Sequence, residues 1–284
     1  MEDDLYIEGE LVSYERRLSP NLKSIEILPI SDAHYGNPLF SKKHFLSTIK
    51  YIKEKHNAFT FLNGDLCESA IRTSLGEIYR QVGSPQDQRD WMIEMLYPIR
   101  KKVLGSTLGN HENRIYRDVG LDICKDIATA LEIPYRASGM LLKILFGSGN
   151  NGHDGQPYIS WGYFTHGYGG ARTKSAKAVK VERLANFLDA DWHAMSHDHV
   201  VNIAPDVYLE HDYRTFPQKD ENGKLTGFNV GKVTQKRRML IKTNAYLKWG
   251  GYAEMGGFPP VDLETPIIKI TSDGAKKLKV KVEV

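Results

Sequence analysis

The sequence predicts an α/β protein in which two mixed β-sheets pack face to face under outer helices, a four-layer α/β/β/α sandwich. Strand patterns alternate with helical patterns between residues 24 and 131, which is typical of a parallel-rich sheet covered by helices. After residue 140 the chain reads mostly as strands. No linker separates the two halves, so we expect residues 1–284 to form a single domain to which each half contributes one sheet.

The first half begins with a buried strand at 24–30, where alternating residues give way to a continuous apolar run. Further buried strands are predicted at 58–62 and 103–108. Helices are predicted where apolar residues recur at helical spacing, namely over 41–56, from Ser84 onward, and over 121–131. Ser84 followed by Pro85 has the sequence of an N-cap and first helical residue.

The second half is richer in strands. They are expected at 140–146, 158–165 and 192–195, with one helix over 174–188 between the last two. From residue 199 onward, short strand patterns are separated by Gly, Pro and Asp. The polar stretch 206–233 is interpreted as an insertion, either a loop or a long hairpin.

Composition excludes several classes of protein. With 41% hydrophobic and 26% charged residues, the chain is not expected to be disordered and has enough apolar residues for a large buried core. Cys67 and Cys124 are too few for a disulfide scaffold and indicate reduced thiols of a cytoplasmic protein. The acidic N-terminus is unlike a signal peptide, and no apolar run reaches about 18 residues, so no membrane association is expected. The net charge of +3 permits a phosphate-rich partner without favouring one, and nothing indicates an oligomeric state.

Polar side chains able to bind metals follow five of the predicted strands. They are Asp32 and His34 in Ser-Asp-Ala-His, Asp65 in Asn-Gly-Asp, Asn110 and His111 in Gly-Asn-His-Glu, His166 in His-Gly, and His197 and His199 in Ser-His-Asp-His. Open α/β sheets bind ligands beyond the carboxyl ends of their strands. Imidazole nitrogens combined with carboxylate and amide oxygens suit manganese, iron or zinc. The set is too large for one ion and fits two.

This ordered series of blocks resembles the calcineurin-like metallophosphoesterase superfamily. It runs from Asp32 to His199, more than half of the chain. The segment from Ser69 to Arg114 also resembles bacteriophage-type members known as exonucleases. The resemblance implies the four-layer fold, hydrolysis of phosphoesters, and two divalent cations, with Mn²⁺ as the first choice and Fe, Zn, Ni, Co or Mg as alternatives.

The resemblance also implies a role for each block. Asp32, His34 and His199 would hold one metal, Asn110, His166 and His197 the other, and Asp65 would bridge both. His111 would protonate the leaving group. Glu68 stands where the family usually has an aspartate that orients this histidine, and is expected to take over that role.

Two positions depart from the family pattern. Ser196 replaces the glycine that usually begins the last block, which should require only a slight backbone adjustment. Ser69 replaces the arginine that follows the second block in the protein-phosphatase branch, and this counts against that branch.

Substrate contacts are expected from Arg114, just after the third block, and from Tyr168 and Arg172 in a glycine-rich loop. Such a loop, leading into a helix N-terminus, can hold a phosphate. Basic residues then follow at a spacing of three: Lys174, Lys177, Lys180 and Arg183. They either track a nucleic-acid backbone or form a solvated helix face.

The sequence therefore predicts a dinuclear metal-dependent phosphodiesterase whose leading substrate is nucleic acid, DNA or RNA. Two alternatives stay open. One is a phosphomonoesterase or cyclic-nucleotide phosphodiesterase that acts on small phosphates. The other is a catalytically silent metal-binding scaffold, which would have no need of the complete ligand set.

Overall fold

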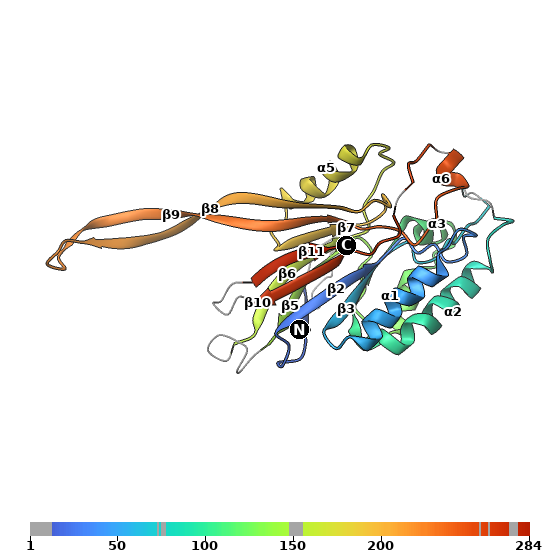
Figure 1. The fold of residues 1–284 in the computed structure, drawn as a ribbon, viewed down its shortest axis with the longest axis horizontal. Coiled ribbons are helices and arrows are strands. Elements are labelled where there is room, and N and C mark those ends of the chain that lie inside the picture. The colour runs from blue at the N-terminus through green and yellow to red at the C-terminus, as the bar shows by residue number, and fades with distance from the viewer. Residues whose placement is uncertain are drawn as a thin grey trace, which may run out of the picture.

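The computed structural model describes residues 13–72, 74, 78–147, 156–255, 257–260, 262–272 and 278–284. Within these residues two mixed sheets pack against each other, and helices cover their outer faces (Figure 1). The fold class predicted from the sequence is the one observed. None of the described helices has the length and apolar character needed to cross a membrane.

The first sheet has the strand order β11-β10-β2-β3-β4 in the described part of the chain. Its strands are β2 (Ser24–Ile30), β3 (Ala58–Asn63), β4 (Val103–Thr107), β10 (Ile267–Ser272) and β11 (Leu278–Glu283). Strands β2, β3 and β4 are parallel, so their carboxyl ends reach the same edge. β2 is buried on both faces, because Ile25 and Ile27 pack between the sheets while Leu28 and Ile30 pack under the helices.

The second sheet has the order β1-β5-β6-β7-β9-β8 among the described residues. Its strands are β1 (Ser13–Arg17), β5 (Gly139–Phe146), β6 (Tyr158–Thr165), β7 (Trp192–Met195), β8 (Asn202–Lys219) and β9 (Leu225–Lys242). β6, β7 and β9 are parallel and end at the same edge. The sequence patterns did not predict β1.

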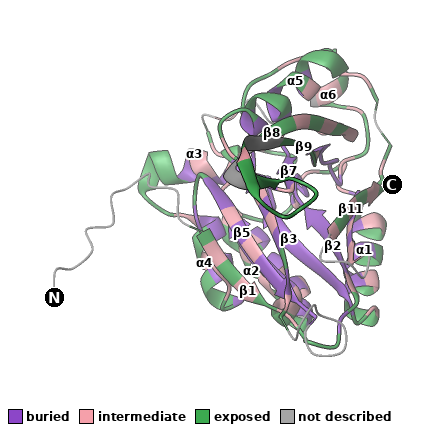
Figure 2. Ribbon diagram, turned by 90° about the vertical axis from the view of Figure 1, so that its left-hand side faces the viewer, coloured by how far each residue is buried: buried purple, intermediate pink, exposed green. Residues whose placement is uncertain are grey.

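Helices form the two outer layers. They are α1 (Lys42–Glu54), α2 (Pro85–Leu96), α3 (Asn110–Val119), α4 (Ile123–Ala130), α5 (Lys174–Ala185) and the short α6 (Tyr252–Met255), with a 3₁₀ turn η1 (Tyr97–Lys102) after α2. One core lies between the first sheet and α1, α2 and α4; another lies between the sheets; a smaller one lies under α5. Figure 2 shows β2 and β3 buried in the centre, with exposed residues on the helices.

The predicted cap of α2 is present, since the Ser84 hydroxyl accepts a hydrogen bond from the Asp87 amide and Pro85 is the first helical residue. The helix predicted over 121–131 is α4, whereas α3, which precedes it, was not predicted. Gly120, at φ 74°, ends α3 in a left-handed conformation before α4 begins. α3 was not predicted because its sequence is mostly polar, with only Glu112 and Ile115 buried.

Strands β8 and β9 form an antiparallel hairpin that extends far beyond the sheet (Figure 1). Near the body, Met239 and Ile241 of β9 pack in the core. Farther out, both strands remain paired up to Lys219 and Leu225. Residues 206–233, interpreted from the sequence as an insertion, form the outer part of this hairpin.

Candidate metal centre

The loops after β2, β3, β4, β6 and β7 converge, and they bring all the predicted ligand residues together. Backbone hydrogen bonds join the first two loops, since the Asp32 amide donates to the Gly64 carbonyl at 3.0 Å and the His34 amide donates to the Asp65 carbonyl at 3.0 Å. The last block joins the same edge, because the His197 amide donates to Asp32 Oδ2 at 3.2 Å. The two sheets thus contribute to one site at their shared carboxyl edge.

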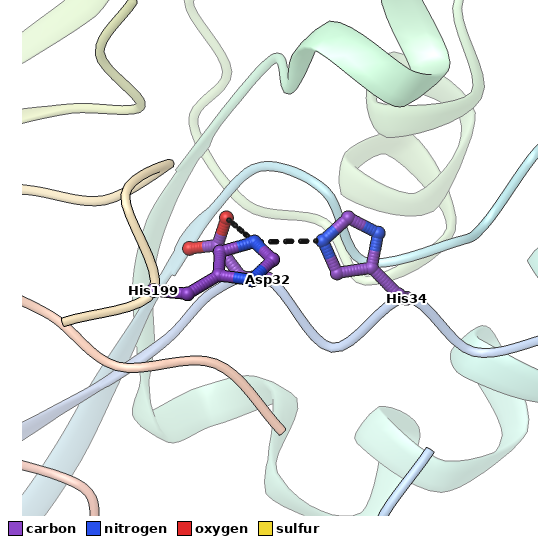
Figure 3. A group of neighbouring side chains, drawn as sticks. All are labelled: Asp32, His34 and His199. Atoms are coloured by element: carbon purple, nitrogen blue, oxygen red, sulfur yellow. Dashed lines mark hydrogen bonds and ion pairs between the residues drawn. The ribbon is translucent and has the colours of Figure 1, made fainter. Parts of the chain in front are cut away.

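The first group of side chains consists of Asp32, His34 and His199 (Figure 3). His199 Nε2 lies 3.2 Å from Asp32 Oδ1 and 3.1 Å from His34 Nε2. Asp32 and His34 are almost fully buried, and beyond its ion-pair contact with His199, Asp32 Oδ1 accepts no hydrogen bond from the described residues. A buried carboxylate oxygen and two imidazole nitrogens directed at one another are a donor set that fits a divalent cation.

The second group consists of Asp65, His166 and His197, with Asn110 beside them. Asn110 Oδ1 lies 2.9 Å from His166 Nε2 and 2.7 Å from His197 Nδ1. His166 Nε2 lies 3.2 Å from Asp65 Oδ2. The group therefore offers two nitrogens and two oxygens around a common centre, which again fits a divalent cation.

One oxygen of Asp65 faces both groups. Asp65 Oδ2 lies 3.2 Å from His166 Nε2, 3.8 Å from His34 Nε2 and 4.0 Å from His111 Nε2. The other oxygen, Oδ1, accepts a hydrogen bond from the His111 amide at 2.7 Å. That bond fixes the carboxylate so that Oδ2 stands between the two groups, as a bridging ligand would.

Hydrogen bonds to backbone carbonyls fix which ring nitrogen carries a proton. A carbonyl oxygen can only accept, so His166 Nδ1 donates to Asn63 at 2.8 Å and His197 Nε2 donates to Gly169 at 2.6 Å. His166 Nε2 and His197 Nδ1 remain directed into the site. Partners of this kind orient metal-binding histidines and set their tautomers.

Five of the seven proposed ligand residues share an unusual backbone conformation. Positive φ angles occur at Asp32 (48°), His34 (48°), Asp65 (50°), His197 (73°) and His199 (53°). Residues other than glycine rarely adopt the left-handed region; each such residue costs about 1–3 kcal/mol and persists only where its surroundings impose the conformation. Strain concentrated at five ligand positions indicates a functional site.

Two glycines allow the second and third blocks to approach each other. A Cβ atom on Gly109 would stand 1.9 Å from the Asp65 amide nitrogen, and one on Gly64 would stand 2.6 Å from the Gly109 Cα. Gly64 also has a φ of 76°. A side chain at either position would push Asp65 away from Asn110, which explains glycine in both blocks.

In the metal-free protein, protonated histidines offset the negative charge of the carboxylates in the site. Although burial opposes it, His199 holds the pKa of Asp32 at about 2. Burial also disfavours a charged His166, but Asp65 and the Asn63 carbonyl raise its pKa to about 10. Glu68 and Asp65 likewise raise the pKa of His34, although burial lowers it. His166 must lose its Nε2 proton before it can bind a cation, so metal ions would replace these protons.

The orienting role expected of the Glu68 carboxylate toward His111 needs correction. His111 Nδ1 donates to the backbone carbonyl of Glu68 at 2.9 Å, whereas the side-chain oxygen Oε1 lies 3.8 Å away. The carboxylate lies closer to His34, with Oε2 3.4 Å from Nδ1. Against the effect of burial, His34 lowers the pKa of Glu68 to about 2. Glu68 thus orients His111 through its backbone and faces His34 through its side chain.

His111 itself is neutral at pH 7 in the metal-free protein. Burial lowers its pKa to about 4; Asp65 opposes this effect, and His34 and Arg114 reinforce it. Since Nδ1 donates to Glu68, the Nε2 atom that faces Asp65 carries a lone pair. An acid role for His111 therefore requires that an anionic substrate favour a second proton.

Sequence reasoning assigned no role to Glu112, which is fully buried. Its carboxylate accepts hydrogen bonds from the Asp65 amide at 3.1 Å and the Cys67 amide at 2.9 Å, and so holds the loop that carries Asp65. Burial and Asp65 raise its pKa to about 7. Its place at the end of the Gly-Asn-His-Glu block was the signal available in the sequence.

Ser196 does more than replace a glycine. Its hydroxyl oxygen lies 2.5 Å from the Asn63 amide nitrogen, which donates to it, and 2.8 Å from the Thr243 hydroxyl. Asn63 also accepts a hydrogen bond from Thr107 at 2.8 Å. The serine thus links the β7 end to the β3 and β4 ends, a contact that glycine would lack.

The predicted substrate-binding residues lie around the site rather than in it. Arg114 is half-buried on α3, one turn after His111, whose pKa it lowers. Tyr168 and Arg172 are exposed on the loop between β6 and α5. The Gly169 carbonyl of that loop accepts the hydrogen bond from His197, so the loop borders the metal ligands.

The expected row of basic residues on α5 is wrong in two places. Lys177 and Lys180 are buried, and their ammonium groups contact Asp198 rather than solvent. Lys174 and Arg183 are exposed. A nucleic-acid backbone could therefore meet Arg172 and Lys174 but not Lys177.

No protein-family model matches the chain, and no curated protein matches it. Solved structures do. A metallophosphoesterase from Sphaerobacter thermophilus is 14% identical over 92% of this chain and 89% of its own, with a TM-score of 0.38. The nuclease MPE of Pseudomonas putida is 12% identical over 90% and 87%, with a TM-score of 0.34. Vacuolar protein sorting 29 of Cryptosporidium parvum is 14% identical over 92% and 97%, with a TM-score of 0.40.

One of the matched structures is thus a metallophosphoesterase and another a nuclease. At TM-scores of 0.40 and below, these likenesses are too distant to assign an activity. The activity has to be inferred from the residues of the site.

Proposed function

We propose that this chain is a calcineurin-like metallophosphoesterase that hydrolyses phosphodiesters with two divalent cations. One observation carries the proposal: Asp65 Oδ2 stands between two groups of proposed ligand side chains, 3.2 Å from His166 Nε2 and 3.8 Å from His34 Nε2. A carboxylate shared by two donor sets is the arrangement that a dinuclear centre requires. Strained backbone at five of the proposed ligand positions supports a functional metal centre, and hydrolysis of a diester would separate an enzyme from a silent metal-binding scaffold.

The residues of the chain divide the work. Asp32, His34 and His199 would hold one cation, Asn110, His166 and His197 the other, and Asp65 both. Mn²⁺ is our first choice because the donors mix imidazole, carboxylate and amide. When bound, such cations activate a water molecule and neutralise the charge that develops on the phosphoryl group. His111, with Nε2 directed at the site, would give the leaving oxygen a proton.

We propose nucleic acid as the substrate class. Arg172 and Lys174 are exposed, and the loop that carries Arg172 and Tyr168 borders His197. Their positive charges can contact backbone phosphates on either side of the scissile one, while Tyr168 offers an exposed ring for base stacking. Arg114, whose charge acts on His111, would contact a phosphoryl oxygen. The resemblance to bacteriophage exonucleases stays a prediction of the sequence.

The double variant Arg172→Ala/Lys174→Ala tests this substrate class. We expect it to cleave labelled DNA with Mn²⁺ several-fold more slowly at low salt and to flatten the salt dependence, because each lost phosphate contact lowers the salt slope by about one. Hydrolysis of bis(4-nitrophenyl) phosphate should stay unchanged, since that ester is too small to reach α5. The matched control is Lys43→Ala/Lys53→Ala, which removes the same charge from exposed positions on α1.

The substrate panel should also hold 4-nitrophenyl phosphate and cyclic nucleotides. If the wild type leaves DNA and RNA intact but turns over a monoester or a cyclic nucleotide efficiently, the nucleic-acid proposal fails and the small-phosphate alternative replaces it. Equal losses in the α5 and α1 variants would show a general charge effect rather than a binding surface.

A further inference from the structure

Three lysines and one aspartate form a buried ionic cluster directly behind the His197–His199 loop. The cluster consists of Lys177, Lys180, Lys242 and Asp198. The side chain of Lys242 is 0% exposed, that of Asp198 2% and that of Lys180 11%. Asp198 was no ligand candidate, and two of these lysines were expected on the surface.

All three ammonium groups hold the ligand loop. Lys180 Nζ lies 2.7 Å from Asp198 Oδ1, and Lys242 Nζ lies 2.6 Å from Oδ2. Lys242 also donates to the Ser196 carbonyl at 2.8 Å, and Lys177 donates to the Asp198 carbonyl at 2.9 Å. The loop is thereby fastened to α5, which carries Lys177 and Lys180, and to the end of β9, which carries Lys242.

Such a cluster is a poor device for stability alone. Removing several charges from water costs more than their mutual attraction commonly returns, and here two ammonium groups share one carboxylate while the third meets a backbone carbonyl. The surplus positive charge is satisfied by the carbonyls of the ligand loop itself. Its location therefore indicates a function at that loop.

The loop needs such support because both of its histidines have strained backbone, with φ of 73° at His197 and 53° at His199. Asp198 lies between them, and its side chain reaches back to the lysines. His197 meets Asn110 at the second group, and His199 meets Asp32 at the first. A single anchored residue thus sets the direction of one ligand to each cation.

We propose that Asp198, clamped by Lys180 and Lys242, is a positioning residue for both metal-binding groups. This inference rests on the proposed function, because it requires that His197 and His199 bind cations. Loss of the clamp should release the loop from its left-handed conformation and lower metal affinity at both sites, as loss of groups that orient metal ligands commonly does, by about 10–100-fold.

The test is calorimetric titration of metal-free protein with Mn²⁺, together with the visible absorption spectrum of the Co²⁺-loaded form. Asp198→Asn and Lys180→Met should each weaken Mn²⁺ binding by about 10–100-fold and alter the Co²⁺ bands. Lys180→Arg keeps the charge and should retain most of the affinity. This pair of variants decides the question even if Asp198→Asn does not fold.

The matched control is Asp206→Asn. Asp206 Oδ2 lies 2.6 Å from Arg238 Nε, and Arg238 also donates to the Ala185 carbonyl at the end of α5. This variant loosens the same helix–strand contact without touching the ligand loop, so it should lower Tm but leave Mn²⁺ affinity and the Co²⁺ spectrum unchanged.

Wild-type affinity and spectrum in Asp198→Asn or Lys180→Met would overturn the inference, as would an equal loss of affinity in Asp206→Asn. Neither result would affect the proposed function. A wild-type protein that binds no Mn²⁺ would instead overturn the proposed function, and this inference with it.

Discussion

Replacement of Asp65 by asparagine should abolish phosphodiester hydrolysis, with a loss of about 10³-fold or more, and should deplete both cations at once. The expected loss is large because removal of a single group that stabilises charge in an active site already lowers kcat by about 10²–10³-fold. Asp65 Oδ2 is the atom that faces both ligand groups. An amide at that position has neither the charge nor the second acceptor that a bridging ligand needs.

The same variant should remain folded. Asparagine keeps Oδ1, which accepts the His111 amide, and the Glu112 carboxylate still holds the loop through the residue-65 amide. Metal content by elemental analysis, circular dichroism and initial rates are the measurements. A folded Asp65→Asn protein with wild-type turnover, or with one cation fully retained, would refute the shared-ligand arrangement.

Replacement of His111 by asparagine should slow substrates with poor leaving groups by about 10²–10⁴-fold while both cations remain bound. The two proposed ligand groups do not include His111, whose Nε2 lies 4.0 Å from Asp65 Oδ2. Nitrophenolate leaves without much help from a proton, so bis(4-nitrophenyl) phosphate should be affected much less. Metal loss, or equal damage to both kinds of substrate, would exclude His111 as the acid.

The pH dependence adds a second check on His111. Its pKa of about 4 means that it is mostly neutral at pH 7, and the protonated fraction rises about tenfold for each pH unit below that. For a poor leaving group, the ratio of wild-type to His111→Asn kcat/KM should therefore rise as the pH falls from 8 to 6. The ratio cancels metal loss common to both proteins. The Glu68 carboxylate lies nearer to His34 than to His111, at 3.4 Å against 3.8 Å. We therefore expect Glu68→Gln to show no such rise in the ratio of wild-type to variant kcat/KM.

The layers of the fold follow from periodicity that is visible in the sequence. Continuous apolar residues in β2 place the strand between two cores, and the serine-proline start of α2 is a local signal that no tertiary contact overrides. α3 could not be predicted because its polar residues carry a ligand and a buried glutamate instead of an apolar stripe. β1, with half-exposed residues, gains its structure from pairing with β5, a contact that local sequence does not encode.

The convergence of the proposed ligand residues could be predicted because each one follows a strand in a short motif. The contacts that orient them could not be predicted, since they join residues far apart in the chain. The Asn63 carbonyl that meets His166 is 103 residues away, and Lys242 lies 46 residues from Ser196. The sequence of α5 likewise indicates an exposed basic face, but in the structure Lys177 and Lys180 contact Asp198.

The most direct test of a dinuclear phosphoesterase is the initial rate of bis(4-nitrophenyl) phosphate hydrolysis by metal-free wild-type protein titrated with Mn²⁺. Two ligand groups that share Asp65 predict a rate that rises until two ions are bound per chain and then stays constant. A full rate at one ion per chain, or no hydrolysis at any Mn²⁺ content, would contradict it.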